Sequence, residues 1–266
     1  MSLDEVKYQV AVANRILAEL GLATGITSSV GHASMRVPEQ PDRFVVKGRG
    51  YDLDIVGLMR PEEMVVCDLE GRRIEAPAGV SQCYEVKMHS CIYRAHPNVQ
   101  SVVHVHPRFT ILMSVLEKRL RPMSNSGGKL VRPAIPIYPH NKLILTDQDG
   151  SEVAELMGRG NAVLLKGHGA VTAGTTLEEA VTNMAQLEEQ AMLNTFAFGL
   201  MGREHPYISD EMLDETANQP PFWQVPHFDM AAPPVRSHHA DKHQDFRGHG
   251  LWAHYVDKVT EEGRGR

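Results

Sequence analysis

Two histidines occupy alternate positions in one apolar run of the chain, residues 101–109, which reads SVVHVHPRF. In a strand, residues two apart point to the same face, so His104 and His106 would project together while Val103 faces the opposite layer. Pro107 would end the strand, because proline has no N–H for a sheet ladder. Neutral imidazole is the commonest nitrogen ligand, so the pair could share one metal ion. The alternative is that one histidine caps a turn and the other packs against a helix.

A third imidazole follows another apolar strand pattern. His168 lies between Gly167 and Gly169 in the stretch LLKGHGAV. Glycine allows close backbone approach and unusual dihedral angles, so the two glycines could hold this imidazole at a defined angle. A histidine in an ordinary β-turn is the alternative reading.

A carboxylate could complete the set. Glu85 lies early in a helical pattern that precedes the His104 strand. His89 follows one helical turn later and could orient Glu85, or it could be a buried packing residue. A solvated helix face, or a salt bridge between Glu85 and Lys87, would explain the carboxylate without any site.

The elements that would position these residues alternate between helical and strand periodicity. A helix is expected at 3–20, and Thr175 or Thr176 would open a long helix that ends near residue 199. The pattern indicates one mixed α/β domain, residues 1–205, followed by a Pro-, His- and Asp-rich extension, residues 206–266. Between these elements we expect strands at 33–37, 43–46 and 99–106, a hairpin turning at 70–71, helices at 81–96 and 109–116, and two strands within 161–174.

Composition excludes several classes of protein. The 266 residues carry a net charge of −6 and no long basic cluster, so no nucleic-acid partner is expected. No run of eighteen apolar residues exists, which predicts no membrane span. The three cysteines lack metal-type spacing and indicate reduced thiols in a cytoplasmic protein. Within the extension, residues 236–256 hold five histidines without a recognised metal spacing, so we expect the extension to pack on the domain or on a neighbouring subunit, anchored by Trp252 and Tyr255. These five are His238, His239, His243, His249 and His254.

The ordered set of Glu85, His104, His106 and His168 resembles the class II aldolase/adducin family. Other stretches that carry the resemblance, from about Val10 to Leu193, are GHASMR at 31–36, KGRGYD at 47–52 and KGHGAVTAG at 166–174. The resemblance implies an α/β fold, a three-layer α/β/α sandwich around a mostly antiparallel mixed sheet. It also implies a homotetramer with active sites near subunit interfaces. His104, His106 and His168 would bind a divalent metal ion, and Glu85 would be the catalytic acid/base.

The residues expected to face the substrate depart from the family's sugar-phosphate enzymes. His32 stands where asparagine is expected, and Lys47 and Arg49 replace a small Ser/Thr-Gly turn. Arginine pairs with carboxylates in a two-pronged fork, so these residues suit a planar substrate that carries carboxylates. An ordinary solvated turn is the alternative for Lys47 and Arg49. Tyr255 could complete the site of an adjacent subunit, as C-terminal residues do in this family.

These features resemble the family's decarboxylase branch, which implies a carbon–carbon lyase that acts on a small aromatic carboxylate. A hydroxylated dicarboxylate, such as 3-hydroxy-2-methylpyridine-4,5-dicarboxylate or a dihydroxyphthalate, would lose CO₂ through a metal-stabilised enolate or phenolate. The branch favours Mn²⁺, although Zn²⁺, Fe²⁺ or Co²⁺ would also suit the ligands. One alternative is a class II sugar-phosphate aldolase or epimerase. The other is a non-catalytic, adducin-like binding module, although such members lose histidines that this chain keeps.

Overall fold

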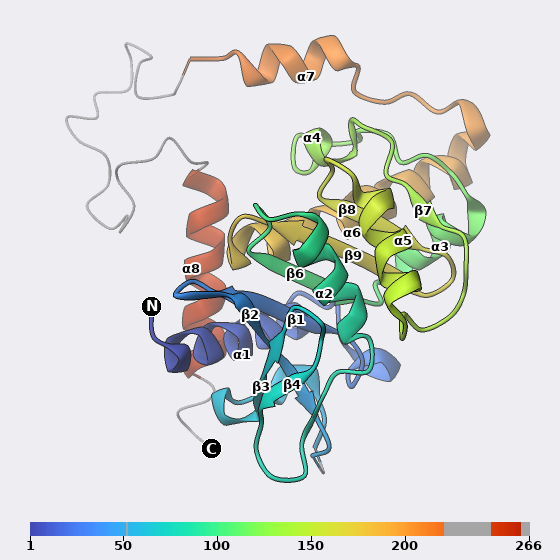
Figure 1. The fold of residues 1–266 in the computed structure, drawn as a ribbon. Coiled ribbons are helices and arrows are strands. Elements are labelled where there is room, and N and C mark those ends of the chain that lie inside the picture. Colours follow the sequence, from blue (N-terminus) through green and yellow to red (C-terminus); the bar gives the residue numbers. More distant parts are fainter. Residues whose placement is uncertain (52, 221–245, 262–266) are drawn as a thin grey trace, which may run out of the picture.

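A nine-stranded mixed sheet forms the middle of the protein (Figure 1). The computed structural model describes residues 1–51, 53–220 and 246–261. The strand order is β4-β3-β2-β1-β6-β9-β8-β7, with β5 paired to β2, and every pairing is antiparallel except β7 with β8. The strands are β1 (His32–Val37), β2 (Gln40–Arg49), β3 (Met64–Asp68), β4 (Arg73–Glu75), β5 (Ser81–Gln82), β6 (Ser101–Val105), β7 (Ile137–Tyr138), β8 (Ala162–Leu165) and β9 (Gly169–Gly174).

Helices cover both faces of this sheet, which gives three layers. One face is covered by α1, α3 and α6, with α8 packed on α1 and α6, and the other face by α2 and α5. The expected α/β/α sandwich is therefore confirmed. The helices are α1 (Leu3–Glu19), α2 (Val86–Ala95), α3 (Arg108–Leu116), α4 (Gly128–Val131), α5 (Asp147–Met157), α6 (Leu177–Met201), α7 (Asp210–Ala217) and α8 (Phe246–Glu261).

Strand β6 lies at the centre of the sheet and shows why the layers form. Its side chains alternate, so Val102 packs in the core beneath α2 and α5, while Val103 and Val105 pack in the core beneath α1, α3 and α6. On its two sides, β1 places His32 opposite His104 and β9 places Val171 opposite His104. The end of β6 therefore sits where three strands can supply side chains to one site.

Local signals in the sequence explain where several helices begin. Ser2 accepts a hydrogen bond from the Glu5 N–H and Thr176 accepts one from the Glu179 N–H, so α1 and α6 both start at side-chain caps. The helix expected at 81–96 starts later than predicted, at Val86, because the first residues of that segment pair with Gly48 and Arg49 as strand β5. Glu85 is consequently the residue that precedes the first turn of α2.

The C-terminal extension contributes two described helices. Trp252 and Tyr255 on α8 pack against the core beneath α1 and α6 of this chain, while their role as anchors of the extension on a neighbouring subunit stays a prediction. His238, His239 and His243 lie outside the described residues, and the boundary between 1–205 and 206–266 stays a prediction. Within the described parts of the chain, no helix combines the length and apolarity that a membrane crossing requires.

Candidate metal and active site

Four side chains predicted from the sequence meet at the end of β6. The Nε2 atoms of His104 and His106 are 3.0 Å apart, and Glu85 Oε2 lies 3.3 Å from His104 Nε2 and 3.5 Å from His168 Nε2. The potential ligand atoms of all four residues lie within 4.8 Å of one another. The cluster draws on three separate parts of the chain: β6 with the residue after it, the β8–β9 turn, and the start of α2.

The geometry of this cluster fits a divalent metal ion. Ligand atoms that share an ion at about 2.0–2.2 Å are separated by roughly 3.0–3.5 Å, which matches the three distances above. His104 Nδ1 lies 2.9 Å from the carbonyl oxygen of Ala170, so Nδ1 carries the proton and Nε2 keeps a free lone pair. Among the described residues, neither buried ring nitrogen of His168 has a hydrogen-bond partner, which would be costly unless a cation used one of them.

Electrostatics keep the His106 imidazole in the neutral form that binds metals. Burial, together with His104 and His168, lowers the pKa of His106 to about 3. A neutral imidazole presents a lone pair, whereas a protonated one would repel a cation. His104, His106 and His168 could therefore hold the metal ion, with Glu85 beside them.

The two glycines that flank His168 are required by the backbone. Gly167 has a φ of +67°, a left-handed conformation that other residues rarely adopt. A side-chain carbon added at Gly169 would lie 2.3 Å from the carbonyl oxygen of Val105, so only glycine allows this approach of β9 to β6. The backbone on both sides of His168 therefore requires glycine, and the expectation that these glycines hold the imidazole at a defined angle stays a prediction.

The two oxygens of Glu85 have different surroundings. Oε1 accepts a hydrogen bond of 3.0 Å from the backbone N–H of Ile144, while Oε2 faces the imidazoles. Burial raises the pKa of the Glu85 carboxyl, and positive charge at the position of His104 and His168 lowers it by more, so a cation at the cluster would keep this pKa below its usual range. Glu85 therefore rests as a carboxylate that presents one oxygen, Oε2, to the site.

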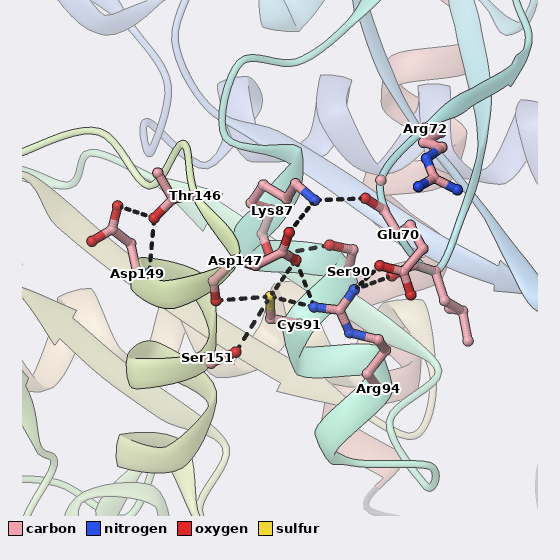
Figure 2. A network of polar contacts seen from close by, with 12 residues as sticks. Glu70, Arg72, Lys87, Ser90, Cys91, Arg94, Thr146, Asp147, Asp149 and Ser151 are labelled. Atoms are coloured by element: carbon pink, nitrogen blue, oxygen red, sulfur yellow. Dashed lines mark hydrogen bonds and ion pairs between the residues drawn. The ribbon is translucent and has the colours of Figure 1, made fainter.

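A polar network joins α2 to the start of α5, three residues after Ile144 (Figure 2). Asp147, the first residue of α5, accepts hydrogen bonds of 2.7 Å from both Lys87 and Arg94 on α2. Arg94 also donates to Glu70 in the β3–β4 turn, at 2.9 Å. These groups are partly exposed, so each pair contributes little alone, but together they join α2 to the start of α5. The distance between Glu85 and the Ile144 N–H depends on that junction.

A carboxylate from α6 fixes the chain on the other side of the cluster. Helix α3 begins two residues after His106, and Pro107, which precedes it, provides no side-chain cap. Glu188 supplies one instead, since it accepts from the N–H groups of Phe109 at 3.0 Å and Thr110 at 2.8 Å, and from the Thr110 hydroxyl at 2.6 Å. Glu188 thereby anchors the segment that follows His106.

Cationic side chains of β2 lie beside the cluster, because β2 pairs with β5 and β5 ends three residues before Glu85. Lys47 is 1% exposed and forms an ion pair with Asp54. Arg49 Nε lies 3.1 Å from Asp54 Oδ2, and its guanidinium stacks on the ring of Tyr84, 4.6 Å from the centroid. The alternative of a solvated turn is therefore wrong for Lys47. Burial lowers the pKa of Lys47, and the hydrogen bond with Asp54 offsets part of that effect.

His32 also lies at the cluster, whereas Tyr255 does not. The rings of His32 and His104 are 5.2 Å apart, and His32 Nδ1 is 2.7 Å from His89 Nε2. Among the described residues, His89 makes no hydrogen bond to Glu85, so it does not orient that carboxylate as the sequence suggested. Tyr255 instead lines a cavity of about 260 Å³ between α1, α6 and α8, which shares no residue with the cluster.

Three functional groups were not recognised in the sequence. Asp54 lies close to the KGRG turn, and its proximity to two basic residues was an available signal. The Ile144 N–H could not be found from the sequence, because a backbone N–H does not depend on the type of residue. Glu188 sits on the predicted long helix, where a carboxylate normally indicates a solvated face.

Comparisons with known proteins agree with this arrangement. Residues 8–195 match the family model described as Class II Aldolase and Adducin N-terminal domain. The chain is 30% identical over 192 residues to 3,4-dihydroxyphthalate decarboxylase of Arthrobacter keyseri, which covers 70% of this chain and 75% of that protein. It is 34% identical over 145 residues to L-fuculose phosphate aldolase of Methanococcus vannielii, which covers 53% and 73% of the two chains.

Among solved structures, an aldolase II superfamily protein from Pseudomonas syringae superposes with a TM-score of 0.74 at 19% identity and covers 98% of this chain and 94% of that one. At this identity the likeness concerns the fold, which is the expected sandwich. The family model, by contrast, spans most of the chain and includes all four clustered residues. The protein belongs to the class II aldolase and adducin family.

Proposed function

We propose that this protein is a metal-dependent decarboxylase of a hydroxylated aromatic dicarboxylate, with a dihydroxyphthalate or 3-hydroxy-2-methylpyridine-4,5-dicarboxylate as the substrate type. The observation that carries the proposal is the cluster of three histidines and Glu85 with Lys47, Arg49 and His32 beside it. Similarity to 3,4-dihydroxyphthalate decarboxylases supports the substrate class.

The metal ion, Mn²⁺ in our proposal, would be held by His104, His106 and His168. When bound, it supplies Lewis acidity that favours charge on substrate oxygens. The guanidinium of Arg49, whose side chain stays partly accessible beside Asp54, would pair with a substrate carboxylate and place the ring against Glu85, while the buried Lys47, paired with Asp54, would add positive charge nearby. The buried cluster excludes water from the reacting atoms.

Glu85 would move the proton in this reaction. As a carboxylate, its Oε2 can take the proton of the ring hydroxyl and return it to the ring carbon that carries the departing group. Electrons of the ring form the new C–H bond, which leaves a ketone-like tautomer. The bond between that carbon and the carboxylate then breaks, CO₂ leaves, and the electron pair of the broken bond restores the aromatic ring as a phenolate. Because the Ile144 N–H occupies Oε1, the proton is carried on Oε2, the oxygen that faces the site.

The test is a measurement of CO₂ release from 3,4-dihydroxyphthalate and related hydroxylated dicarboxylates by protein loaded in turn with Mn²⁺, Zn²⁺, Fe²⁺ or Co²⁺. Glu85→Gln should keep the metal, because three imidazoles remain, but lose about 10²–10⁴-fold in kcat, because an amide carries no transferable proton. Full metal content with near-normal kcat in Glu85→Gln would remove Glu85 from the mechanism.

A sugar-phosphate aldolase is the second candidate, favoured by the similarity to L-fuculose phosphate aldolase. The same preparation should therefore be tested with L-fuculose 1-phosphate. Carbon–carbon bond cleavage of this sugar phosphate, without CO₂ release from any aromatic acid, would reverse the proposal. A protein purified without metal and unable to bind it would favour the adducin-like binding module.

A further inference from the structure

A chain of four hydrogen-bonded side chains runs from the core of the protein to the candidate site. Tyr93 Oη lies 2.7 Å from Ser34 Oγ, Ser34 Oγ lies 2.6 Å from His89 Nδ1, and His89 Nε2 lies 2.7 Å from His32 Nδ1. Ser34 and His89 are 0% exposed, Tyr93 is 1% exposed and His32 is 3% exposed. No water competes for these groups, so each polar hydrogen of the four side chains needs an acceptor within the hydrogen-bonded chain.

The phenol at the buried end determines the first hydrogen. Among the described residues, Ser34 Oγ is the acceptor within hydrogen-bond distance of Tyr93 Oη, and the other group beside the phenol, the Val102 backbone, acts as a donor. If Ser34 donated to Tyr93, the phenolic hydrogen would be buried without an acceptor, which costs about 1–3 kcal/mol. Tyr93 therefore donates and the Ser34 oxygen accepts.

The Ser34 hydroxyl hydrogen then has two possible acceptors. His89 Nδ1 is 2.6 Å away, whereas the carbonyl oxygen of Val102 is 3.4 Å away, beyond the usual range for an O–H donor. Donation to His89 uses the short contact and leaves Nδ1 of His89 unprotonated. A neutral His89 then carries its hydrogen on Nε2 and donates it to His32 Nδ1.

This sequence of donors fixes the state of the last ring. His32 Nδ1 accepts, so a neutral His32 carries its hydrogen on Nε2, for which the described residues provide no hydrogen-bond partner. His32 lies opposite His104 across the β1–β6 pairing, and its ring is 5.2 Å from that of His104. The free Nε2–H is therefore the part of the chain that can meet a bound molecule.

We propose that His32 is a neutral hydrogen-bond donor to an anionic oxygen of the substrate, and that Ser34 and His89 are positioning residues that fix its Nε2–H tautomer. The identity of the anion as an aromatic carboxylate or phenolate rests on the proposed function, but the tautomer does not. A neutral donor suits this position, because it recognises an anion without adding another positive charge beside Lys47.

Nitrogen-15 NMR of histidine-labelled, zinc-loaded protein tests the tautomers directly, since Zn²⁺ is diamagnetic. His32→Gln and His89→Gln assign the two spin systems by their disappearance. We expect the Nε2 of both rings to show the shift of a protonated nitrogen and Nδ1 that of an unprotonated one. Protonated Nδ1 on His32 would overturn the proposal.

Ser34→Ala tests the origin of the tautomer. Without the hydroxyl donor, nothing fixes which nitrogen of His89 carries the hydrogen. The His32 signals should therefore move toward a mixture of tautomers. Tyr93→Phe should leave the tautomers unchanged, because Ser34 still donates to His89. Signals that stay in place in Ser34→Ala would show that the chain does not set the tautomer of His32.

Kinetics with 3,4-dihydroxyphthalate test the contact itself. His32→Leu should lower kcat/KM on the order of 10–100-fold, as expected for a lost hydrogen bond to a charged group, and His32→Gln, which keeps an N–H donor, should recover part of it. Thr172→Val is the control, because it removes a buried hydroxyl of β9 that donates to the Ala180 carbonyl oxygen and, among the described residues, bonds to no residue of the candidate site. Equal losses in His32→Leu and the control would refute the contact. If wild-type protein does not turn over this acid, the proposed function fails while the NMR result stands.

Discussion

Replacement of Glu188 by alanine tests whether the carboxylate on α6 holds the segment after His106. Glu188→Ala removes the acceptor of two first-turn N–H groups of α3 and of the Thr110 hydroxyl. A lost helix cap costs about 0.5–2 kcal/mol, and hydrogen bonds to charged groups contribute about 1.5–3 kcal/mol each. Burial of the Glu188 carboxylate offsets part of the stabilisation that these hydrogen bonds provide, since burial disfavours the charged form and raises the pKa of Glu188.

These terms give a net loss of about 2–4 kcal/mol in the free energy of unfolding for Glu188→Ala. For a domain of this size, that corresponds to a fall in Tm of roughly 4–16 °C. Thermal unfolding of metal-loaded protein, followed by circular dichroism, measures it. The control is Glu189→Ala, which changes the exposed neighbouring residue on the same helix. Metal affinity should also fall, because His106 is joined directly to the loosened segment.

The pH dependence of the Glu188→Gln variant provides a second check. The folded pKa of Glu188 is raised, so its favourable contribution is complete below the unfolded value, about 4.3, and is lost as pH rises through the folded pKa. Glutamine has no such titration. The stability difference between wild type and Glu188→Gln should therefore narrow as pH rises through this window. A Tm for Glu188→Ala equal to that of Glu189→Ala, or a difference that widens with pH, would refute the cap.

Three further substitutions address the metal, the substrate and the α2–α5 junction. His168→Ala should remove most of the bound metal, measured by elemental analysis, and full occupancy would mean that the three-histidine site is wrong. Arg49→Ala should raise KM for an aromatic dicarboxylate about 10–100-fold, and an unchanged KM would mean that this guanidinium does not touch the substrate. Asp147→Ala releases α5 from α2 and should lower kcat with metal retained, because the Ile144 N–H is displaced from Glu85. Unaltered kcat would show that this junction does not position the carboxylate.

The three-histidine set could be predicted from sequence because its signals are local. Alternation along one strand places His104 and His106 together, and the glycines around His168 mark a turn that only glycine allows. The residue types and their order then pointed to the family, and the family to the fold. Each of these inferences needed only short stretches of chain.

The remaining parts of the site depend on tertiary register, which no short stretch encodes. Lys47 was expected to be available for substrate, but the path of the chain after β2 brings Asp54 against it. Glu188 caps α3 only because α6 crosses that helix. Tyr255 was placed in a substrate site by analogy with other members of the family, whereas within one chain it packs beside α1 and α6. Its role in an adjacent subunit stays a prediction.

The central place of β6 has a consequence for how the protein folds. Its partners, β1 and β9, come from distant parts of the chain on either side of it. Each pairing therefore closes a long loop and loses conformational entropy before the strand contacts stabilise it. The candidate site draws its histidines from these strands and the turn between β8 and β9, so no fragment of the chain forms it early. In refolding experiments, the capacity to bind a metal should therefore emerge with the slowest phase that completes the sheet, after α1 and α6 have acquired their helical signal.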